Sequence, residues 1–425
     1  MIMAVDGNVH LSAFHLIERT APTVQALENL DEEIRQSLSG LNLPAQNLRG
    51  KQIAVAVGSR GIANLQQMVR AVCGWLKAQG ANPFIFPAMG SHGGATAEGQ
   101  LKILAEYGVT SDLIGAEVRS SMATVSLGKS PEGFQVFMDR QAWESDGVVV
   151  INRVKPHTDF SGKTESGLLK MMAVGMGKEE GARETHYWGW KHGFAQVIRA
   201  MSAIVLASRK ILCGLAVAEN EMHQTCALRA ARPDHIVSME EELLMFARPL
   251  LPRLPFSRLH LLIVDELGKN ISGTGMDTNV IGRGFEMYPV EGPHIGMIYV
   301  RDLTPESGGN AVGMGLADVI HDRFYQKIDF QKTYLNSRVS LNPAPSKLPM
   351  HLPSDRDAIG LALGHLGRPD PAEQRVVWIR NTLSLNRLAV SAPLAEEASR
   401  LAGWCMESDA RTPQFDSAGN LTSPL

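Results

Sequence analysis

Cysteine is scarce in this chain of 425 residues, and its four copies form no recognisable motif. No two of them stand in a CxxC spacing, and they are scattered as Cys73, Cys213, Cys226 and Cys405. Small disulfide-stapled domains and cysteine-only zinc sites both depend on closely spaced cysteines. The sequence therefore argues against both, and its 44% of hydrophobic residues is ample for ordinary hydrophobic cores.

The chain also lacks a strong excess of charge and any long apolar run. Its net charge is −3, and no block of Lys and Arg exceeds a few residues, so we expect no nucleic-acid partner. The start, MIMAVDGNVHLSAFHL, has no basic segment followed by an apolar one. No stretch approaches the roughly 18 apolar residues of a membrane helix. We expect no membrane partner and a soluble, cytoplasmic protein.

Short apolar runs alternate with amphipathic runs of helical length. The apolar spacing predicts strands at 52–57, 83–89 and 147–154, and helices at 63–80, 96–108, 165–175 and 194–209. Strands that alternate with helices in this way are typical of βαβ units, whose strands run parallel. The fold class we expect is therefore α/β, with Rossmann-like, mostly parallel sheets.

A proline-rich stretch, ARPLLPRLP (247–255), interrupts the pattern, which restarts with LHLLIVDELG (259–268). Further strands are predicted at 296–303 and 375–379, with helices near 310–336. We expect two domains, at residues 1–255 and 256–425, with an active site in the cleft between them. The terminal residues, TPQFDSAGNLTSPL, are typical of a loose tail.

The stretch NRVKPHTDFSGKTESGLLKMM (152–172) contains SGKT, which is close to the end of a phosphate-binding loop. Such a loop has the form G-x-x-x-x-G-K-[ST], so that glycine-rich backbone can surround the phosphates. Five residues before Gly162, however, stands His157 and not glycine. Asp159 would also bring a carboxylate to the phosphates. The sequence therefore does not contain a nucleotide loop of this kind.

Three polar side chains follow three predicted strands directly, in glycine-containing or proline-containing turns. They are Arg60, His92 and His157. Ligand sites of open α/β sheets form at the carboxyl ends of the strands, so these side chains could share one crevice. Two imidazoles could then accept and donate protons at near-neutral pH, and Arg60 could bind a carboxylate with two hydrogen bonds. Alternatively, the loop histidines are exposed to solvent or cap helices.

Two further positions have a structural and a functional interpretation. Lys170 stands among leucine and methionine on the predicted helix 165–175, where it either extends outward to water or, if desolvated, becomes a nucleophile. His186 and His192 are metal ligands or members of an aromatic cluster with the neighbouring tryptophans. Their spacing is not that of a standard zinc pair.

Together these residues resemble the lactate racemase family, whose enzymes use a nickel-pincer nucleotide. The resemblance is clear over most of the N-terminal half and is general in outline beyond it. It is carried by an ordered set of short motifs, which are Gly90-Ser91-His92, Pro156-His157, Ser166-Gly167-Leu168-Leu169-Lys170, Gly175 and His186.

The resemblance implies a role for each site residue. The cofactor of the family is derived from nicotinic acid and holds nickel through two sulfurs and a ring carbon. Lys170 would tether this cofactor, and Ser166 and Gly167 would lie near the tether. His186 would complete the nickel coordination. His92 and His157 would be the acid/base pair, and Arg60 would position substrate or cofactor. In the C-terminal domain, DELGKNISGTGMD (265–277) stands where the family has a loop that supplies a lysine to the site. Lys269 is the candidate for this lysine, or Met276 occupies the lysine's position instead.

The implied activity is inversion of C2 of a 2-hydroxy acid by a racemase or epimerase, through hydride transfer to the nickel-pincer nucleotide. Proteins that synthesise the cofactor would be required partners. The segment between His157 and Ser166 is longer than in the lactate enzymes and carries Asp159, Lys163 and Glu165. This favours a substrate larger or more polar than lactate, such as a sugar acid.

Two other classes of function stay open at the level of sequence. The first is a metal-dependent hydrolase or lyase in which His92, His157 and His186 bind zinc, although no short H-x-H or H-x3-H pair is present. The second is a protein without catalytic activity that binds a nucleotide or a metal.

Overall fold

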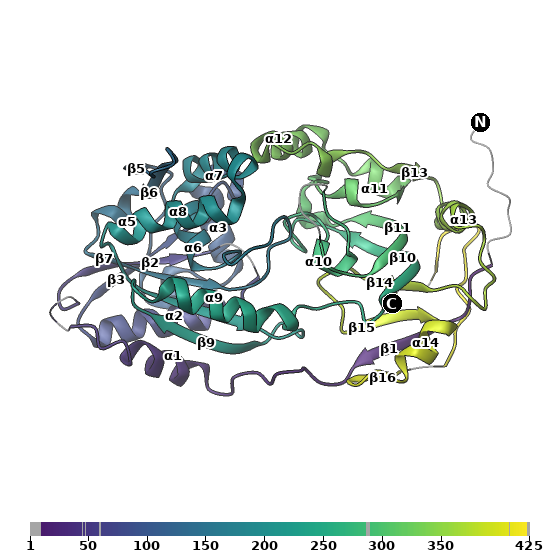
Figure 1. Cartoon of the computed structure of the whole chain (residues 1–425), viewed down its shortest axis with the longest axis horizontal. Coiled ribbons are helices and arrows are strands. Elements are labelled where there is room, and N and C mark those ends of the chain that lie inside the picture. Colours follow the sequence, from purple (N-terminus) through teal and green to yellow (C-terminus); the bar gives the residue numbers. More distant parts are fainter. Residues whose placement is uncertain are drawn as a thin grey trace. The chain divides into compact units, whose positions relative to one another are not determined.

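A computed structural model describes residues 10–44, 46, 48–58, 61–285, 290–407 and 409–422 (Figure 1). The chain forms two compact units, which we call the 24–251 unit and the 252–425 unit. The second of these also includes the start of the chain, up to Thr23. Each unit is described by itself. No helix among the described residues is long and apolar enough to cross a membrane.

The 24–251 unit contains a six-stranded α/β sheet. Its strands β4, β3, β2, β7 and β8 run parallel, and only the edge strand β9 is antiparallel. In spatial order, the strands are β4 (Glu117–Val118), β3 (Asn82–Pro87), β2 (Gln52–Val57), β7 (Gly147–Arg153), β8 (Ile211–Glu219) and β9 (Thr225–Ala231). The prediction of a mostly parallel α/β sheet is confirmed.

Helices cover both faces of this sheet, and a separate hairpin is formed by β5 (Thr124–Lys129) and β6 (Gln135–Asp139). On one face, side chains of α1 and α2 share a hydrophobic core with the strands. On the other face, Leu168 of α6 and Ile236 of α9 pack against Gly214 of β8. The helices are α1 (Leu30–Ser39), α2 (Leu65–Ala78), α3 (Ala97–Glu106), α4 (Ser111–Ile114), α5 (Arg140–Glu144), α6 (Leu168–Lys170), α7 (Lys178–His192), α8 (Phe194–Ala207) and α9 (Ile236–Ala247).

The strand order places the candidate residues at one edge of the sheet. Strands β3 and β4 lie on one side of β2, whereas β7 and β8 lie on the other. The order in which the chain adds strands thus reverses between β2 and β7, although both strands run parallel. Open α/β sheets bind ligands at the carboxyl ends of the strands at such a point. His92 follows β3, and His157 follows β7, so both emerge at this edge.

The 252–425 unit is built on an eight-stranded sheet. Its first five strands in spatial order run parallel to one another, and each of the last three pairs antiparallel with the strand before it. In spatial order, the strands are β13 (Met350–Leu352), β12 (Val319–His321), β11 (His294–Leu303), β10 (Arg258–Leu267), β14 (Val376–Ile379), β15 (Arg387–Ser391), β1 (Phe14–Arg19) and β16 (Trp404–Met406). The helices are α10 (Thr278–Ile281), α11 (Asp322–Gln326), α12 (Phe330–Ser340), α13 (Asp355–His365) and α14 (Ala392–Ala398).

The position of β1 alters the expected division of the chain. We expected domains at 1–255 and 256–425, but β1 is inserted between β15 and β16 with antiparallel pairing to both. The first described residues therefore belong with the 252–425 unit, and the later boundary falls at Pro252. Pairing between strands about 370 residues apart leaves no local periodic signal in the sequence.

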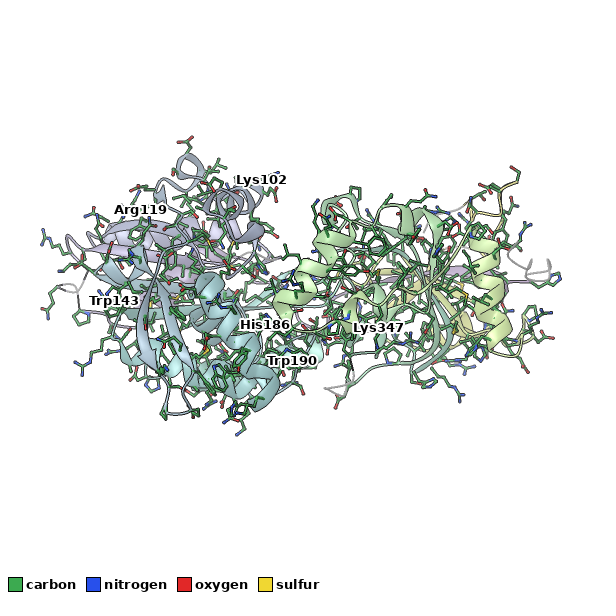
Figure 2. All side chains as sticks on the ribbon, turned by 90° about the horizontal axis from the view of Figure 1, so that it is seen from above. Lys102, Arg119, Trp143, His186, Trp190 and Lys347 are labelled. Atoms are coloured by element: carbon green, nitrogen blue, oxygen red, sulfur yellow. The ribbon has the colours of Figure 1, made fainter. Side chains whose placement is uncertain are left out.

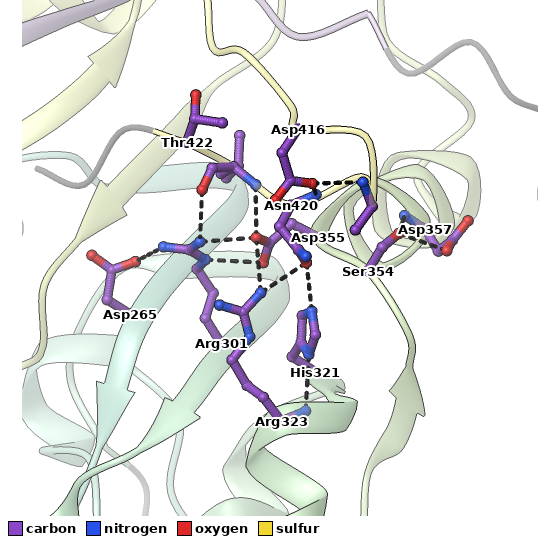
Figure 3. A network of polar contacts seen from close by, with 12 residues as sticks. Asp265, Arg301, His321, Arg323, Ser354, Asp355, Asp357, Asp416, Asn420 and Thr422 are labelled. Carbon is purple, nitrogen blue, oxygen red and sulfur yellow. Dashed lines mark hydrogen bonds and ion pairs between the residues drawn. The ribbon is translucent and has the colours of Figure 1, made fainter.

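The end of the chain is anchored in a buried polar network (Figure 3). Arg301 donates two hydrogen bonds to Asp355, at 2.9 and 2.8 Å, and also pairs with Asp265. The backbone N–H of Leu421 donates to Asp355 at 2.8 Å, and Arg323 donates to the side chain of Asn420 at 2.8 Å. The prediction of a loose tail is wrong at Asn420 and Leu421, because their polar groups bond to this buried network.

Replacing Asp355 with alanine is expected to lower the free energy of unfolding by about 3–5 kcal/mol, because the buried Arg301 loses the carboxylate that accepts two of its hydrogen bonds. The matched control is Asp302→Ala, which removes the more exposed ion pair with Lys327 and is expected to cost about 1 kcal/mol or less. Urea unfolding measures both variants. Equal costs for the two variants would show that the network does not anchor the tail.

Candidate functional site

The loop that follows β7 is held by a buried carboxylate. Glu165 is only 1% exposed and accepts hydrogen bonds from the backbone N–H of His157 at 2.6 Å and of Gly162 at 2.9 Å. Arg248 donates to the same carboxylate at 2.6 Å and to the carbonyl of Gly162 at 2.7 Å. Glu165, which we expected to face the substrate, instead fixes the backbone of the His157 loop. Asp159 and Lys163 remain exposed on this loop.

The helix that carries Lys170 begins later than predicted and changes its hydrogen-bonding pattern. Ser166 is still in extended backbone, because it exchanges two backbone hydrogen bonds with Lys155, at 3.0 and 3.2 Å. Helix α6 therefore starts at Leu168, and a π-helical turn follows at Met171–Gly175. Single π-helical turns are frequent at functional sites. Ser166 and Gly167 thus form the entry to the turn that presents Lys170.

A carboxylate from α9 supports the start of this helix. Glu240 accepts a hydrogen bond from the N–H of Leu169 at 3.0 Å, although it is 71 residues away in the sequence. A Cβ atom on Gly167 would lie 2.4 Å from the side-chain carbon Cδ of Glu240, so only glycine fits there. Burial raises the pKa of Glu240 to about 7, against the lowering effect of the backbone hydrogen bonds.

Lys170 and His157 are in direct contact. The amine nitrogen Nζ of Lys170 meets the ring nitrogen Nε2 of His157, and the other ring nitrogen, Nδ1, accepts the N–H of Asp159 at 3.0 Å. Phe160 stacks on the imidazole with ring centroids 4.2 Å apart, and Phe194 stacks on Phe160. Both polar partners and an aromatic face therefore fix the orientation of the His157 ring.

His186 lies on α7, as Figure 2 shows together with Trp190 on the same helix. Its ring meets Phe194 edge-on at 5.7 Å. Its nitrogen Nδ1 is buried and has no hydrogen-bond partner among the described residues. Burial, and then the positive charge of protonated Lys170, lower the pKa of His186 to about 4. His186 is therefore neutral at physiological pH and can offer a lone pair to a metal.

His192, the second histidine of this helix, is in an aromatic cluster. Its ring centroid lies 5.3 Å from that of Phe134 and 5.5 Å from that of Trp188. His192 therefore fits the aromatic-cluster interpretation, and His186 fits the metal-ligand interpretation, because its buried Nδ1 has no partner in the part of the chain that the structure describes.

His92 lies on the loop after β3, which is supported by buried polar groups. Gln100 donates to the carbonyls of Gly90 at 2.9 Å and of His92 at 3.4 Å. Lys178 donates to Gln100 at 3.1 Å and pairs with Asp139 at 3.1 Å, with both charged side chains fully buried. Sequence analysis did not identify these three supporting residues, because a lysine near the start of an otherwise polar helix carries no distinguishing signal.

The loops of β3 and β7 meet the same π-helical turn. The backbone N–H of Gly90 donates to the carbonyl of Gly175 at 3.1 Å, and Met171 approaches Gly58 at the end of β2. The structure thus brings His157, Lys170 and His186 together with Ser166 and Gly167, and places His92 on the adjoining loop.

The remaining predicted residues lie elsewhere. Arg60 is outside the described residues, so its role stays a prediction. Lys269 belongs to the 252–425 unit, where its amine donates to the carbonyl of Gly273 at 2.5 Å. Met276, the other candidate for that role, is fully buried in the core of its unit, which favours Lys269. A cleft between the units also stays a prediction.

The described part of the chain contains no group of three His, Cys, Asp or Glu side chains placed to hold a metal ion. His92, His157 and His186 are all described, and they do not form such a group. The structure therefore gives no support to a zinc hydrolase or lyase with these three ligands. A metal that arrives within a chelating cofactor needs fewer ligands from the protein.

Comparison with solved structures shows the fold only. A structural-genomics crystal structure of a protein from Thermotoga maritima matches with a TM-score of 0.51 at 15% identity, over 82% of this chain and 96% of that one. The lactate racemase apoprotein from Thermoanaerobacterium thermosaccharolyticum matches with a TM-score of 0.47 at 14% identity, over 86% and 84%. A comparison with curated proteins gave no match.

The family comparison covers the part of the chain that holds the candidate site. Residues 11–192 match the model of the lactate racemase N-terminal domain, and this range includes His92, His157, Lys170 and His186. On this match, residues 11–192 are similar to the N-terminal domain of the lactate racemase family.

Proposed function

We propose that the chain is a racemase or epimerase that inverts C2 of a 2-hydroxy acid with the help of a nickel-pincer nucleotide. The observation that carries the proposal is the meeting of Lys170, His157 and His186 at the edge of a parallel sheet, within a lactate racemase-type domain. An amine, an acid/base group and a neutral imidazole are three different chemical functions. This enzyme class needs all three.

The residues present fit the cofactor. A pincer nucleotide brings most of the nickel ligands itself, so the protein has to add one. His186 suits this role because its imidazole is neutral and its buried Nδ1 lacks a partner among the described residues. Lys170 would form the tether, Ser166 and Gly167 would line its approach, and Lys269 would contribute from the other unit. When bound, the nucleotide supplies the acceptor for the hydride of C2.

The two loop histidines would move protons at the 2-hydroxyl group of the substrate. His157 would take the hydroxyl proton from one enantiomer and His92 from the other, each returning a proton in the opposite direction. Arg60 would bind the carboxylate. Because Asp159 and Lys163 remain exposed on the His157 loop, they support a larger or more polar substrate than lactate, such as a sugar acid.

The test uses the full chain produced together with the proteins that synthesise the cofactor. Single enantiomers of 2-hydroxy acids, including sugar acids, are incubated with the nickel-loaded protein and separated by chiral chromatography. We expect inversion of at least one acid. Inversion by protein that contains no nickel would contradict the proposal.

Replacing His186 with alanine is expected to reduce bound nickel to background, because the protein's own ligand is lost. The matched control is His192→Ala, on the same helix, which removes an aromatic contact and is expected to retain nickel. Nickel content is measured by mass spectrometry of the purified proteins. Full nickel content in the His186 variant would remove this residue from the site.

A further inference from the structure

A buried glutamine holds the loop that carries His92. Gln100, on α3, is fully buried, and its side-chain amide donates hydrogen bonds to the carbonyls of Gly90 at 2.9 Å and of His92 at 3.4 Å. The backbone N–H groups of the same two loop residues are also bonded: Gly90 donates to Gly175 and His92 to Met89, both at 3.1 Å. The backbone of this turn is therefore held at four points.

The direction of the Gln100 amide is fixed by its partners on both sides. Carbonyl oxygens only accept hydrogen bonds, so the NH2 group must face the carbonyls of Gly90 and His92. The amide oxygen then faces the amine nitrogen Nζ of Lys178, which donates to it at 3.1 Å. A buried amide oxygen without a donor is costly. Lys178 thus supplies the donor that this orientation of Gln100 requires.

Lys178 is itself held by three oxygens. Besides its bond to Gln100, its Nζ donates to the carbonyl of Pro87, at the end of β3, at 2.5 Å and forms an ion pair with Asp139 at 3.1 Å. Both charged side chains are fully buried. Removing one member of such a pair is costly, whereas apolar groups in place of both are often neutral for stability. Stability alone therefore does not account for this pair.

The same pair links the His92 loop to the rest of the candidate site. Lys178 begins α7, the helix that carries His186, and lies just after the π-helical turn. The backbone N–H of Asp139 donates to the carbonyl of Met176 at 2.7 Å, between that turn and α7. The network thus fixes the His92 loop against the segment that leads to the candidate nickel ligand.

We propose that Gln100 and Lys178 position His92 for proton transfer: Gln100 holds the backbone of the His92 loop, and Lys178 holds Gln100. The proposal deepens the proposed function and rests on it, because His92 is one of the two acid/base groups of that scheme. An acid or base acts only within hydrogen-bond reach of the proton that it moves, and a displacement of about 1 Å can cost about 10²-fold in rate.

The first test is hydrogen exchange of the full chain, made without the cofactor-synthesis proteins and followed by mass spectrometry. Gln100→Met keeps a side chain of similar length and removes its donors. We expect the peptide that contains Gly90 and His92 to exchange about tenfold faster or more, because two hydrogen bonds that hold this turn are lost. The matched control is Gln141→Met in α5, whose side-chain oxygen has no hydrogen-bond partner among the described residues and which should leave this exchange unchanged. Unchanged exchange in Gln100→Met overturns the role of Gln100.

A second variant tests Lys178. Lys178→Met alone would leave the buried carboxylate of Asp139 unpaired, so Asp139→Asn/Lys178→Met is used instead. Asparagine is neutral and can still accept the N–H of Ala142 as the N-cap of α5. We expect the His92 loop to exchange about two- to tenfold faster than in the wild type, because Gln100 has lost its donor. Exchange equal to that of the wild type overturns the role of Lys178.

The third test uses the nickel-loaded protein and shows whether Gln100 acts through His92. Gln100→Met is expected to lower inversion per bound nickel by about 10²-fold, with the nickel content unchanged. In a His92→Gln background the same substitution should cost little further, because the group that it positions is already absent. An equal loss in both backgrounds, or a loss of nickel, would show a purely structural role and overturn the proposal. If the wild type inverts no 2-hydroxy acid, the proposed function fails, while hydrogen exchange still decides whether Gln100 and Lys178 hold the loop.

Discussion

Replacing His157 with glutamine is expected to reduce the rate of inversion per bound nickel by about 10²–10⁴-fold, the usual contribution of a general acid or base. Glutamine keeps a polar side chain of similar reach but has no group that titrates near neutral pH. The variant therefore removes proton transfer while a polar side chain still reaches Lys170. His92→Gln should give a loss of similar size, because each inversion would use both histidines in the proposed scheme.

The loss should be equal for both enantiomers of a racemase substrate. The equilibrium constant between mirror images is one, so a variant cannot slow one direction alone. Chiral analysis from each pure enantiomer measures both rates, and the nickel content of each preparation provides the normalisation. His235→Gln is the control, since that side chain of the same unit is 73% exposed. A His157 or His92 variant that retains wild-type inversion would contradict the two-base scheme.

The position of the candidate residues in the fold could be predicted from the sequence, whereas the residues that support them could not. His157 and His92 follow strands whose apolar runs are visible in the sequence, and parallel strands end at a common edge, so their proximity to that edge could be predicted. Glu165 stands between the same motifs, but the sequence does not show that its carboxylate turns inward. Its partner Arg248 is 83 residues away.

The start of the Lys170 helix shows the same limit. The apolar spacing of 165–175 fits a helix from its first residue, yet Ser166 is held in extended backbone by Lys155. Backbone pairing outside a helix competes with helix formation, and local propensity does not reveal it. The π-helical turn after Lys170 was likewise not predicted, because it depends on how the loops of β2 and β3 pack against Met171 and Gly175.

Gly167→Ala is expected to lower the free energy of unfolding by about 1–3 kcal/mol, the usual cost of overpacking. Its Cβ would lie 2.4 Å from Cδ of Glu240, and that side chain is buried and cannot move into water. The backbone of Gly167 is extended, so alanine itself is not strained there. The cost should therefore come from the carboxylate alone. Urea unfolding of the single and double variants tests this, because Gly167→Ala should cost little in a Glu240→Ala background.

The pH dependence of unfolding gives a second test of the same contact. Because burial raises the pKa of Glu240 to about 7 from 4.5, the folded state holds a proton that the unfolded state has lost. Its contribution to stability is complete below pH 4.5 and is lost as the pH rises to about 7. Glu240→Gln, which stays neutral, should remove this part of the dependence.

Gly74→Ala is the matched control for the glycine variant. It lies in α2 with no atom within 4 Å of the added Cβ, so it should stabilise the unit by up to about 1 kcal/mol. If Gly167→Ala costs the same with and without Glu240, the carboxylate does not determine the glycine of the S-G-x-x-K motif. If the cost disappears with Glu240, the motif needs glycine because a residue 73 positions later supports the backbone that presents Lys170.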